Sequence, residues 1–95
     1  MKISWFDAAC ADLVDIRRFI EEQDHPAAAQ SAARRILSTV TYLRDHPAIG
    51  RPGRVTGTRE VIIAGLPYIV PYRIRGGVLE ILRVLHTSRQ WPKEL

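Results

Sequence analysis

The sequence predicts an α+β fold, in which an N-terminal strand and an antiparallel helical hairpin pack on an antiparallel β-sheet meander. Three observations support this. Apolar residues recur at spacings of three and four through the first half of the chain, as on one face of a helix. The second half holds segments rich in β-branched residues, separated by Gly and Pro turns, as in strands. The length of 95 residues suits one modest hydrophobic core, so we expect residues 1–95 to form a single domain.

The chain begins with a short strand and a helix. Lys2–Trp5 reads as an amphipathic strand, and Trp5 is expected in the core. Asp7 is a good N-cap residue, so a helix is expected over Ala8–Gln23. Its apolar row is Ala9, Leu13, Ile16 and Ile20. Cys10 falls within this helical pattern and is expected to be a small buried residue.

A second helix follows a break in the chain. Asp24-His25-Pro26 ends the first helix and starts the next, because Pro suits the first helical position and disfavours helix in the residue before it. The apolar row of the second helix is Ala29, Ala33, Ile36, Val40 and Leu43. This helix should stop at His46-Pro47, with His46 capping its end and His25 exposed. The two helices are expected to form an antiparallel hairpin with one shared apolar face.

Strands are expected in the second half, after a loop. Residues 47–57 hold two prolines and three glycines and predict this loop. The predicted strands are Arg59–Ala64, Tyr68–Arg75 and Val78–His86. Gly76-Gly77 is a strong hairpin signal, whereas Pro71 lacks a ladder donor and predicts local irregularity. The sheet face away from the helices should be partly open, and the tail Thr87–Leu95 should lie back on the body.

Charge is distributed unevenly along the chain. Residues 1–25 carry three basic and six acidic residues, a net charge of −3, whereas residues 26–95 carry eleven basic and four acidic residues, a net charge of +7. Twelve of the fourteen basic residues are Arg, whose planar fork suits phosphate and carboxylate groups. An Arg-rich, Lys-poor chain is also what a GC-rich genome produces. The Arg content therefore fits a basic binding surface and coding bias equally well.

Several kinds of site and location are not indicated. The single Cys10 allows no internal disulfide or multi-cysteine site, and no His, Asp or Glu pair has metal-ligand spacing on one helix face. We therefore expect no metal and no cofactor. No apolar run approaches the roughly 18 residues of a membrane span, and the N-terminus has no apolar signal segment. We expect a cytoplasmic protein with no membrane association.

Four motifs occur in order along nearly the whole chain. They are His46-Pro47-Ala48-Ile49-Gly50-Arg51, Gly57-Thr58-Arg59-Glu60, Pro67-Tyr68-Ile69-Val70-Pro71-Tyr72-Arg73 and Ile81-Leu82-Arg83-Val84-Leu85-His86. Together they resemble the RelE/ParE toxins of type II toxin–antitoxin systems. The resemblance implies a toxin that inhibits growth. It also implies a co-expressed antitoxin, of ribbon-helix-helix type, that binds the toxin tightly and neutralises it.

This superfamily divides into two activities. RelE-like members cleave mRNA on the ribosome, using the RNA 2′-hydroxyl as nucleophile and a set of basic side chains, whereas ParE-like members poison DNA gyrase and have no known hydrolytic chemistry. At places where RelE-like sequences often carry basic or aromatic residues, this chain has Glu60, Ile62 and Ile69. The ending Arg-Val-Leu-His followed by Arg89 is more similar to ParE. The resemblance thus favours a gyrase poison that is not an enzyme. A ribosome-dependent mRNA endonuclease and an inactive remnant are the alternatives.

Each activity implies its own candidate residues. An endoribonuclease would use Arg59, Arg83, His86 and Arg89 as its catalytic set. A gyrase poison would contact its target through Arg73, Arg83, Arg89 and Trp91. On a continuous strand Arg83 and His86 belong to opposite faces, so these two are not expected to converge. Simpler roles are a hydrogen-bonded strand end for His86 and a cover over the sheet edge for Trp91.

Other residues have two interpretations each. Arg34 and Arg35 are either a solvated helix face or a contact for an acidic antitoxin. Tyr68 and Tyr72 share one sheet face and serve either as core or as a base-stacking platform. The carboxylate of Glu60 is expected to repel a scissile phosphate. The basic segment and the open sheet face together predict nanomolar binding of an acidic or amphipathic antitoxin segment that folds on binding.

Overall fold

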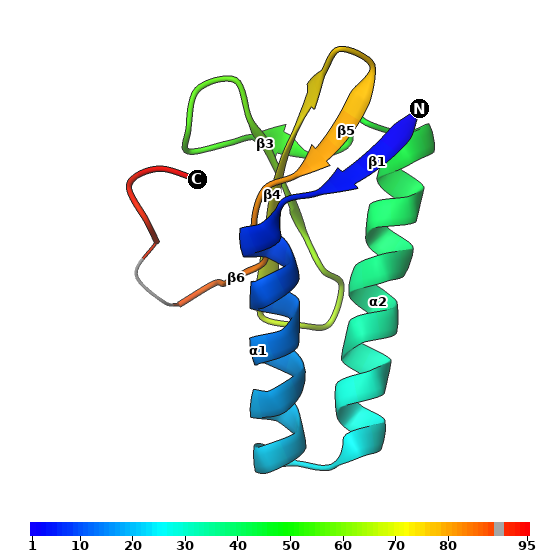
Figure 1. Cartoon of the computed structure of the whole chain (residues 1–95), viewed down its shortest axis with the longest axis vertical. Helices are drawn as coiled ribbons and strands as arrows, with labels where there is room; N and C mark the ends of the chain where they lie inside the picture. The colour runs from blue at the N-terminus through cyan, green and yellow to red at the C-terminus, as the bar shows by residue number, and fades with distance from the viewer. Residues whose placement is uncertain (89–90) are drawn as a thin grey trace.

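Two helices lie side by side against one face of a sheet, and the C-terminal segment lies on the side of the molecule away from α2 (Figure 1). The computed structural model describes residues 1–88 and 91–95. The elements are β1 (Lys2–Trp5), α1 (Asp7–Gln23), α2 (Pro26–Asp45), β2 (Arg51–Pro52), β3 (Arg59–Ile62), β4 (Tyr68–Arg75), β5 (Val78–Ile81) and β6 (Leu85–His86). Among these helices, none has the length and apolar character needed to cross a membrane.

The sheet has the strand order β1-β5-β4-β3-β2, and β6 pairs with β4. The predicted antiparallel meander of β3, β4 and β5 is confirmed, with the Gly76-Gly77 turn joining Arg75 to its partner Val78. The N-terminal strand β1 adds to β5 in parallel, so the sheet is mixed. This pairing brings the first strand of the chain beside a strand far along the sequence, because Lys2 lies opposite Val78.

The two helices follow the predicted apolar rows but begin differently from expectation. Asp7 is the first helical residue, not the N-cap, because the N–H of Phe6 still donates to the carbonyl of Ile81 in the sheet, at 2.9 Å. Helix α1 therefore starts directly after strand pairing ends. In α2 the exposed His25 is the N-cap, and its Nδ1 accepts a hydrogen bond from the N–H of Ala28. His46 is the C-cap of α2, as predicted.

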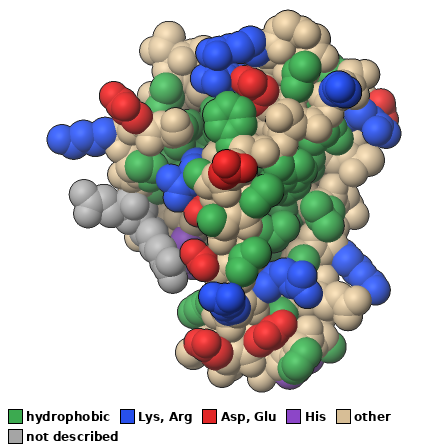
Figure 2. All heavy atoms as spheres, viewed as in Figure 1, with side chains coloured by type: hydrophobic (Ala, Val, Ile, Leu, Met, Phe, Trp, Pro, Cys, Tyr) green, Lys and Arg blue, Asp and Glu red, His purple; other side chains and the backbone are tan. Residues whose placement is uncertain are grey.

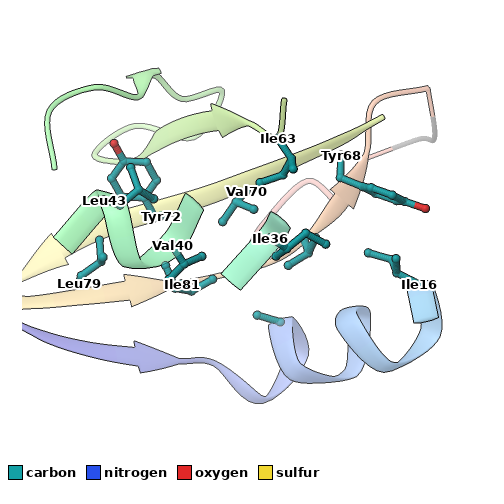
Figure 3. Close-up of a cluster of buried hydrophobic side chains, with 12 residues drawn as sticks. Ile16, Ile36, Val40, Leu43, Ile63, Tyr68, Val70, Tyr72, Leu79 and Ile81 are labelled. Carbon is teal, nitrogen blue, oxygen red and sulfur yellow. The ribbon is translucent and has the colours of Figure 1, made fainter. Parts of the chain in front are cut away.

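The core lies between the helical hairpin and the sheet. Figure 3 shows Ile36, Val40 and Leu43 among the side chains of the strands. The cluster consists of Ala9, Ile16, Ile36, Val40, Leu43, Ile63, Tyr68, Val70, Tyr72, Leu79, Ile81 and Val84. Trp5 packs against it, and Tyr68 and Tyr72 are core residues, so the base-stacking interpretation is wrong. Cys10 is exposed, contrary to expectation, because it lies about 100° around the helix from the buried Ala9.

The predicted strand Val78–His86 is broken into β5 and β6. The break lies beside Pro71 of β4, where the N–H of Leu82 donates to the carbonyl of Pro71 at 3.0 Å. In a strand the N–H and C=O of one residue point to the same side, so Pro71 offers an acceptor there but no donor. Contrary to the expected irregularity at Pro71, β4 runs unbroken through this residue from Tyr68 to Arg75, and the interruption falls on the neighbouring strand.

The loop before β3 is more ordered than predicted. Residues 51–52 form the short strand β2 against β3, and β3 itself ends at Ile62, not at Ala64. Alternation along β3 and β4 places Glu60 and Ile69 on the sheet face away from the helices, yet each is only 3 % exposed. Ile62 on the same face is 53 % exposed. The outer face is therefore open only in part, as predicted.

Replacing Gly76 and Gly77 tests the hairpin between β4 and β5. Their φ angles are +57° and +75°, and a Cβ at either position would meet no atom within 4 Å. The cost of a side chain there is thus backbone strain, about 1–2 kcal/mol per residue. The double Gly→Val variant should unfold at a clearly lower urea concentration. The matched variant Gly77→Asn should lose much less stability, because Asn tolerates positive φ. Equal stability of all three proteins would contradict this turn.

Candidate functional site

A groove lies between α1, the segment of residues 83–86 and the C-terminal segment. Its volume is about 540 Å³. The residues that line it are Asp12, Asp15, Ile16, Phe19, Tyr68, Arg83, Val84, Leu85, His86, Trp91 and Pro92. The side chains between α1 and α2 in Figure 2 form a separate band of hydrophobic groups on the face that this view shows. The groove combines an apolar lining with two carboxylates, one guanidinium and one imidazole.

Arg83 is held in this groove by Asp12 of α1. Its Nε and Nη2 donate to the two carboxylate oxygens of Asp12 at 2.7 and 2.9 Å. The N–H of Val84 donates to the same carboxylate at 2.9 Å. The hydrogen bond to Asp12 raises the pKa of Arg83 above its ordinary value, so this side chain stays charged. Its charge is already matched by a carboxylate, which leaves little positive field for a phosphate.

His86 lies in the same groove, and the expectation that Arg83 and His86 would not converge is wrong. Strand alternation fails there because residues 82–84 do not form a strand. Nδ1 of His86 accepts from the N–H of Ser88 at 3.1 Å and lies 2.8 Å from the Ser88 hydroxyl. A neutral imidazole that accepts at Nδ1 carries its proton on Nε2. The remaining nitrogen, Nε2, can then donate a hydrogen bond but does not accept one.

Trp91 joins the C-terminal segment to the loop before β3. The guanidinium of Arg54 stacks on its ring, with Cζ 3.7 Å from the ring centroid. The prediction that the tail lies back on the body is confirmed by this contact and by the hydrogen bond from Thr87 N–H to Pro67, at 2.9 Å. Nε1 of Trp91 is buried and has no hydrogen-bond partner among the described residues. Sequence reasoning missed Arg54, and its only signal was an Arg within a Gly- and Pro-rich loop.

Two other predicted basic residues, Arg59 and Arg73, do not line this groove. Arg59 donates to the carbonyl oxygens of Gly50 at 2.7 Å and Ala48 at 3.4 Å, which fixes the loop after α2. Arg73 on β4 pairs with Glu80 on β5 at 2.6 Å. Arg89 lies outside the described residues. Among its described members, the proposed catalytic set is thus divided: Arg83 and His86 line the groove, and Arg59 is bound to the loop.

Two buried polar side chains hold the loop before β3. The hydroxyl of Tyr72 donates to the carbonyl of Pro47 at 2.7 Å and accepts from the N–H of Gly50 at 3.0 Å. Glu60 accepts from the backbone N–H of Arg54 at 2.8 Å and lies 3.4 Å from Arg51. The expectation that Glu60 repels a phosphate is wrong, because its buried carboxylate is bound to the loop.

Metal chemistry finds no support in this geometry. Within residues 1–88 and 91–95, no three His, Cys, Asp or Glu side chains come together as a metal site would need. Asp12 and His86 in the groove are bound to Arg83 and Ser88.

Comparison with known proteins decides the family. The family model described as "ParE toxin of type II toxin-antitoxin system, parDE" matches residues 3–91. The chain belongs to the ParE toxin family. It is therefore a toxin of the type II toxin–antitoxin class within the RelE/ParE superfamily, as the motifs indicated.

Relatives of this ParE-family chain carry both superfamily names. "Putative toxin Y4kP" of Sinorhizobium fredii is 47% identical over 99% of this chain and 96% of its own length. "Toxin RelE2" and "Toxin ParE1" of Caulobacter vibrioides are each 34% identical. They cover 93% and 84% of this chain, and 97% and 82% of their own lengths. These names leave the choice between the two activities open.

A solved structure shares the fold. It is described as "Chromosomal ParDE TA system from P. aeruginosa" and has a TM-score of 0.86 and 29% sequence identity. The match covers 93% of this chain and 97% of that chain.

The contact between Asp12 and Arg83 should contribute measurably to stability. Asp12→Ala removes three hydrogen bonds from partly buried donors and should lower the free energy of unfolding by about 2–3 kcal/mol. In a double-mutant cycle with Arg83→Ala, the two losses should be less than additive. Asp15→Ala, an exposed neighbour, should change stability by less than about 0.5 kcal/mol. Additive losses in urea unfolding would argue against coupling of this pair.

Tyr72 should make stability depend on alkaline pH. Tyr72→Phe should lower the free energy of unfolding by about 1–3 kcal/mol at neutral pH, because the carbonyl of Pro47 and the N–H of Gly50 lose their hydrogen-bond partner. Burial raises the pKa of Tyr72 above the ordinary value of 10.0, so the folded state keeps the proton that the unfolded state releases. As the pH rises above 10.0, the difference in free energy of unfolding between the wild-type protein and Tyr72→Phe should therefore become smaller. A constant difference between the two proteins up to strongly alkaline pH would contradict this.

Proposed function

We propose that this ParE-family toxin arrests growth in the cytoplasm by poisoning DNA gyrase, and that a co-expressed antitoxin neutralises it. Two facts support an antitoxin partner: the chain belongs to a type II toxin–antitoxin family, and it shares its fold with a chain from a ParDE system. We take the antitoxin to be of the ribbon-helix-helix type. The choice of gyrase rests on the chemistry of the groove.

The observation that carries this proposal is that the candidate catalytic groups among the described residues, Arg59, Arg83 and His86, are already engaged. Cleavage of RNA by its own 2′-hydroxyl needs a base for that proton, positive charge for the phosphorane and an acid for the leaving oxygen. Arg83 is paired with Asp12, and Arg59 is bound to loop carbonyls outside the groove. His86 accepts from Ser88 and lacks a free acceptor nitrogen. This arrangement suits a binding surface better than a nuclease.

The binding surface that we propose is the groove with the C-terminal segment. Trp91 and Arg83 lie there, with Phe19 of α1 and Pro92 adding apolar surface. Aromatic and Arg side chains commonly dominate the energetics of protein interfaces. Arg73 and Arg89 remain proposed target contacts, although Arg73 lies at the β4–β5 pair and does not line the groove.

One observation favours the alternative, cleavage of mRNA on the ribosome. Arg83 and His86 share the groove, although a continuous strand would have placed them on opposite faces. A ribosome-bound substrate could replace Ser88 at His86 and so free Nδ1. The alternative thus depends on His86, whereas the gyrase proposal depends on the apolar surface around Trp91.

Two assays separate these activities. The purified toxin is incubated with gyrase and supercoiled plasmid, and separately with programmed ribosomes and message. We expect trapped gyrase–DNA cleavage complexes and intact message. Trp91→Ala should weaken trapping by about tenfold or more, because it removes the large aromatic surface of the groove. Arg75→Ala is the matched control and should trap gyrase as the wild-type toxin does, since its side chain is exposed and outside the groove.

The opposite pattern would reverse the choice. Cleaved message without trapped gyrase would establish the nuclease activity, and loss of that cleavage in His86→Ala would identify its base. Equal trapping by wild type and Trp91→Ala would retain gyrase as the target but overturn the groove as the contact surface.

A further inference from the structure

The solvent-facing side of α2 carries a row of polar and basic residues. Ser31, Arg34, Arg35 and Ser38 are spaced by three and four positions, so they share one side of the helix. Together with the turn between β3 and β4, they line a depression of about 570 Å³. Hydroxyl and guanidinium groups are hydrogen-bond donors that suit an anionic ligand.

Both Arg residues lack an acidic partner in the described part of the chain. The ion pairs formed by residues 1–88 and 91–95 within 4.0 Å involve neither Arg34 nor Arg35. One helical turn to either side, the side chains are Gln, Ser, Ala, Leu and Thr, with no carboxylate. Arg73 and Arg83, by contrast, are matched by Glu80 and Asp12. The α2 surface therefore keeps two uncompensated positive charges.

The turn between β3 and β4 gives Arg35 its place. Nη1 of Arg35 lies 3.5 Å from the carbonyl oxygen of Ala64. A Cβ at Gly65 would come within 2.7 Å of the same nitrogen, so a side chain at that position would displace the guanidinium. Glycine at position 65 thus lets Arg35 lie against the turn, with its other N–H groups available to a ligand.

An apolar contact adjoins these charges. A second hollow of about 460 Å³ is lined by Arg34, Leu37, Ser38 and Thr41, and it shares two of these residues with the first. Leu37 is 46% exposed. A phosphate backbone offers no apolar group that could cover an exposed apolar side chain beside its cation site, whereas an amphipathic protein segment can pair with the charges and cover the apolar side chain as well.

We propose that this α2 surface, formed by Ser31, Arg34, Arg35, Leu37, Ser38 and Thr41, binds an acidic amphipathic segment of the antitoxin. Carboxylates of the antitoxin pair with Arg34 and Arg35, and an apolar side chain covers Leu37. This inference rests on the proposed function, in which an antitoxin neutralises the toxin. It adds the surface and the chemistry of the partner segment.

Helix α1 provides the matched comparison. It also exposes two adjacent arginines, Arg17 and Arg18, but Glu21 and Glu22 follow each of them four positions later on the same helix. At that spacing, opposite charges lie next to each other on the helix surface. Each helix therefore exposes two adjacent arginines, but only those of α1 have carboxylates beside them on the same helix.

The experiment compares charge reversal on the two helices. Arg34→Glu/Arg35→Glu and Arg17→Glu/Arg18→Glu variants of the full chain are titrated with the antitoxin encoded beside the toxin gene, in low and high salt. Loss of two desolvated charge pairs and the added repulsion should weaken binding by the α2 variant about 100-fold or more. The α1 variant should bind within about threefold of the wild-type toxin. Far-UV circular dichroism and the neutral Arg34→Gln/Arg35→Gln variant check that the fold is kept.

Each outcome decides one point. Equal binding by wild type and both variants overturns the α2 surface and leaves the antitoxin partnership intact. No binding by the wild-type toxin overturns the partnership itself, and with it this inference. A random-sequence DNA duplex serves as a third probe. If charge reversal on α2 abolishes DNA binding but leaves antitoxin affinity unchanged, the surface binds phosphate and the proposal is wrong.

Discussion

The carboxylate of Asp12 is the contact on which the C-terminal half of the site depends. It receives three hydrogen bonds, two from Arg83 and one from the backbone of Val84, and so joins the first helix to a segment 71 residues later in the chain. That segment is where the sheet is interrupted beside Pro71. Without an acceptor from α1, the freed N–H of Val84 would be left unpaired at a partly buried position. Asp12 thus determines where the chain turns into β6, and with it where His86 and the tail lie.

The basic residues of this protein illustrate why net charge is a poor guide to a binding surface. Arg51, Arg73 and Arg83 are within ion-pair distance of carboxylates, Arg59 is bound to backbone carbonyls, and Arg54 is stacked on Trp91. Much of the positive charge in residues 26–95 therefore organises loops and strands. What remains for a partner is decided by the neighbours of each guanidinium and not by the number of arginines.

Local pattern was enough to predict the helices, the meander and the Gly76-Gly77 turn, because helical spacing and turn chemistry are short-range properties. The family followed from four ordered motifs. The parallel pairing of β1 with β5 is long-range and has no local signal. The shared groove of Arg83 and His86 was missed because alternation presumes an unbroken strand. Cys10 and Asp7 were misplaced by a single helical position, the scale at which sequence boundaries are least reliable.

The parallel pairing of β1 with β5 also sets an order of events during synthesis. Helices α1 and α2 are consecutive in sequence and contact each other, so this hairpin can begin to form as it leaves the ribosome, before the later strands of the sheet are made. Strand β1 must wait for its only partner strand among the described residues, Val78–Ile81, which is synthesised only after β2, β3 and β4. A nascent or truncated chain that stops before residue 78 leaves its N-terminal strand without a neighbour. The groove and the completed sheet therefore form together, only after β5 and the residues that follow it have been synthesised.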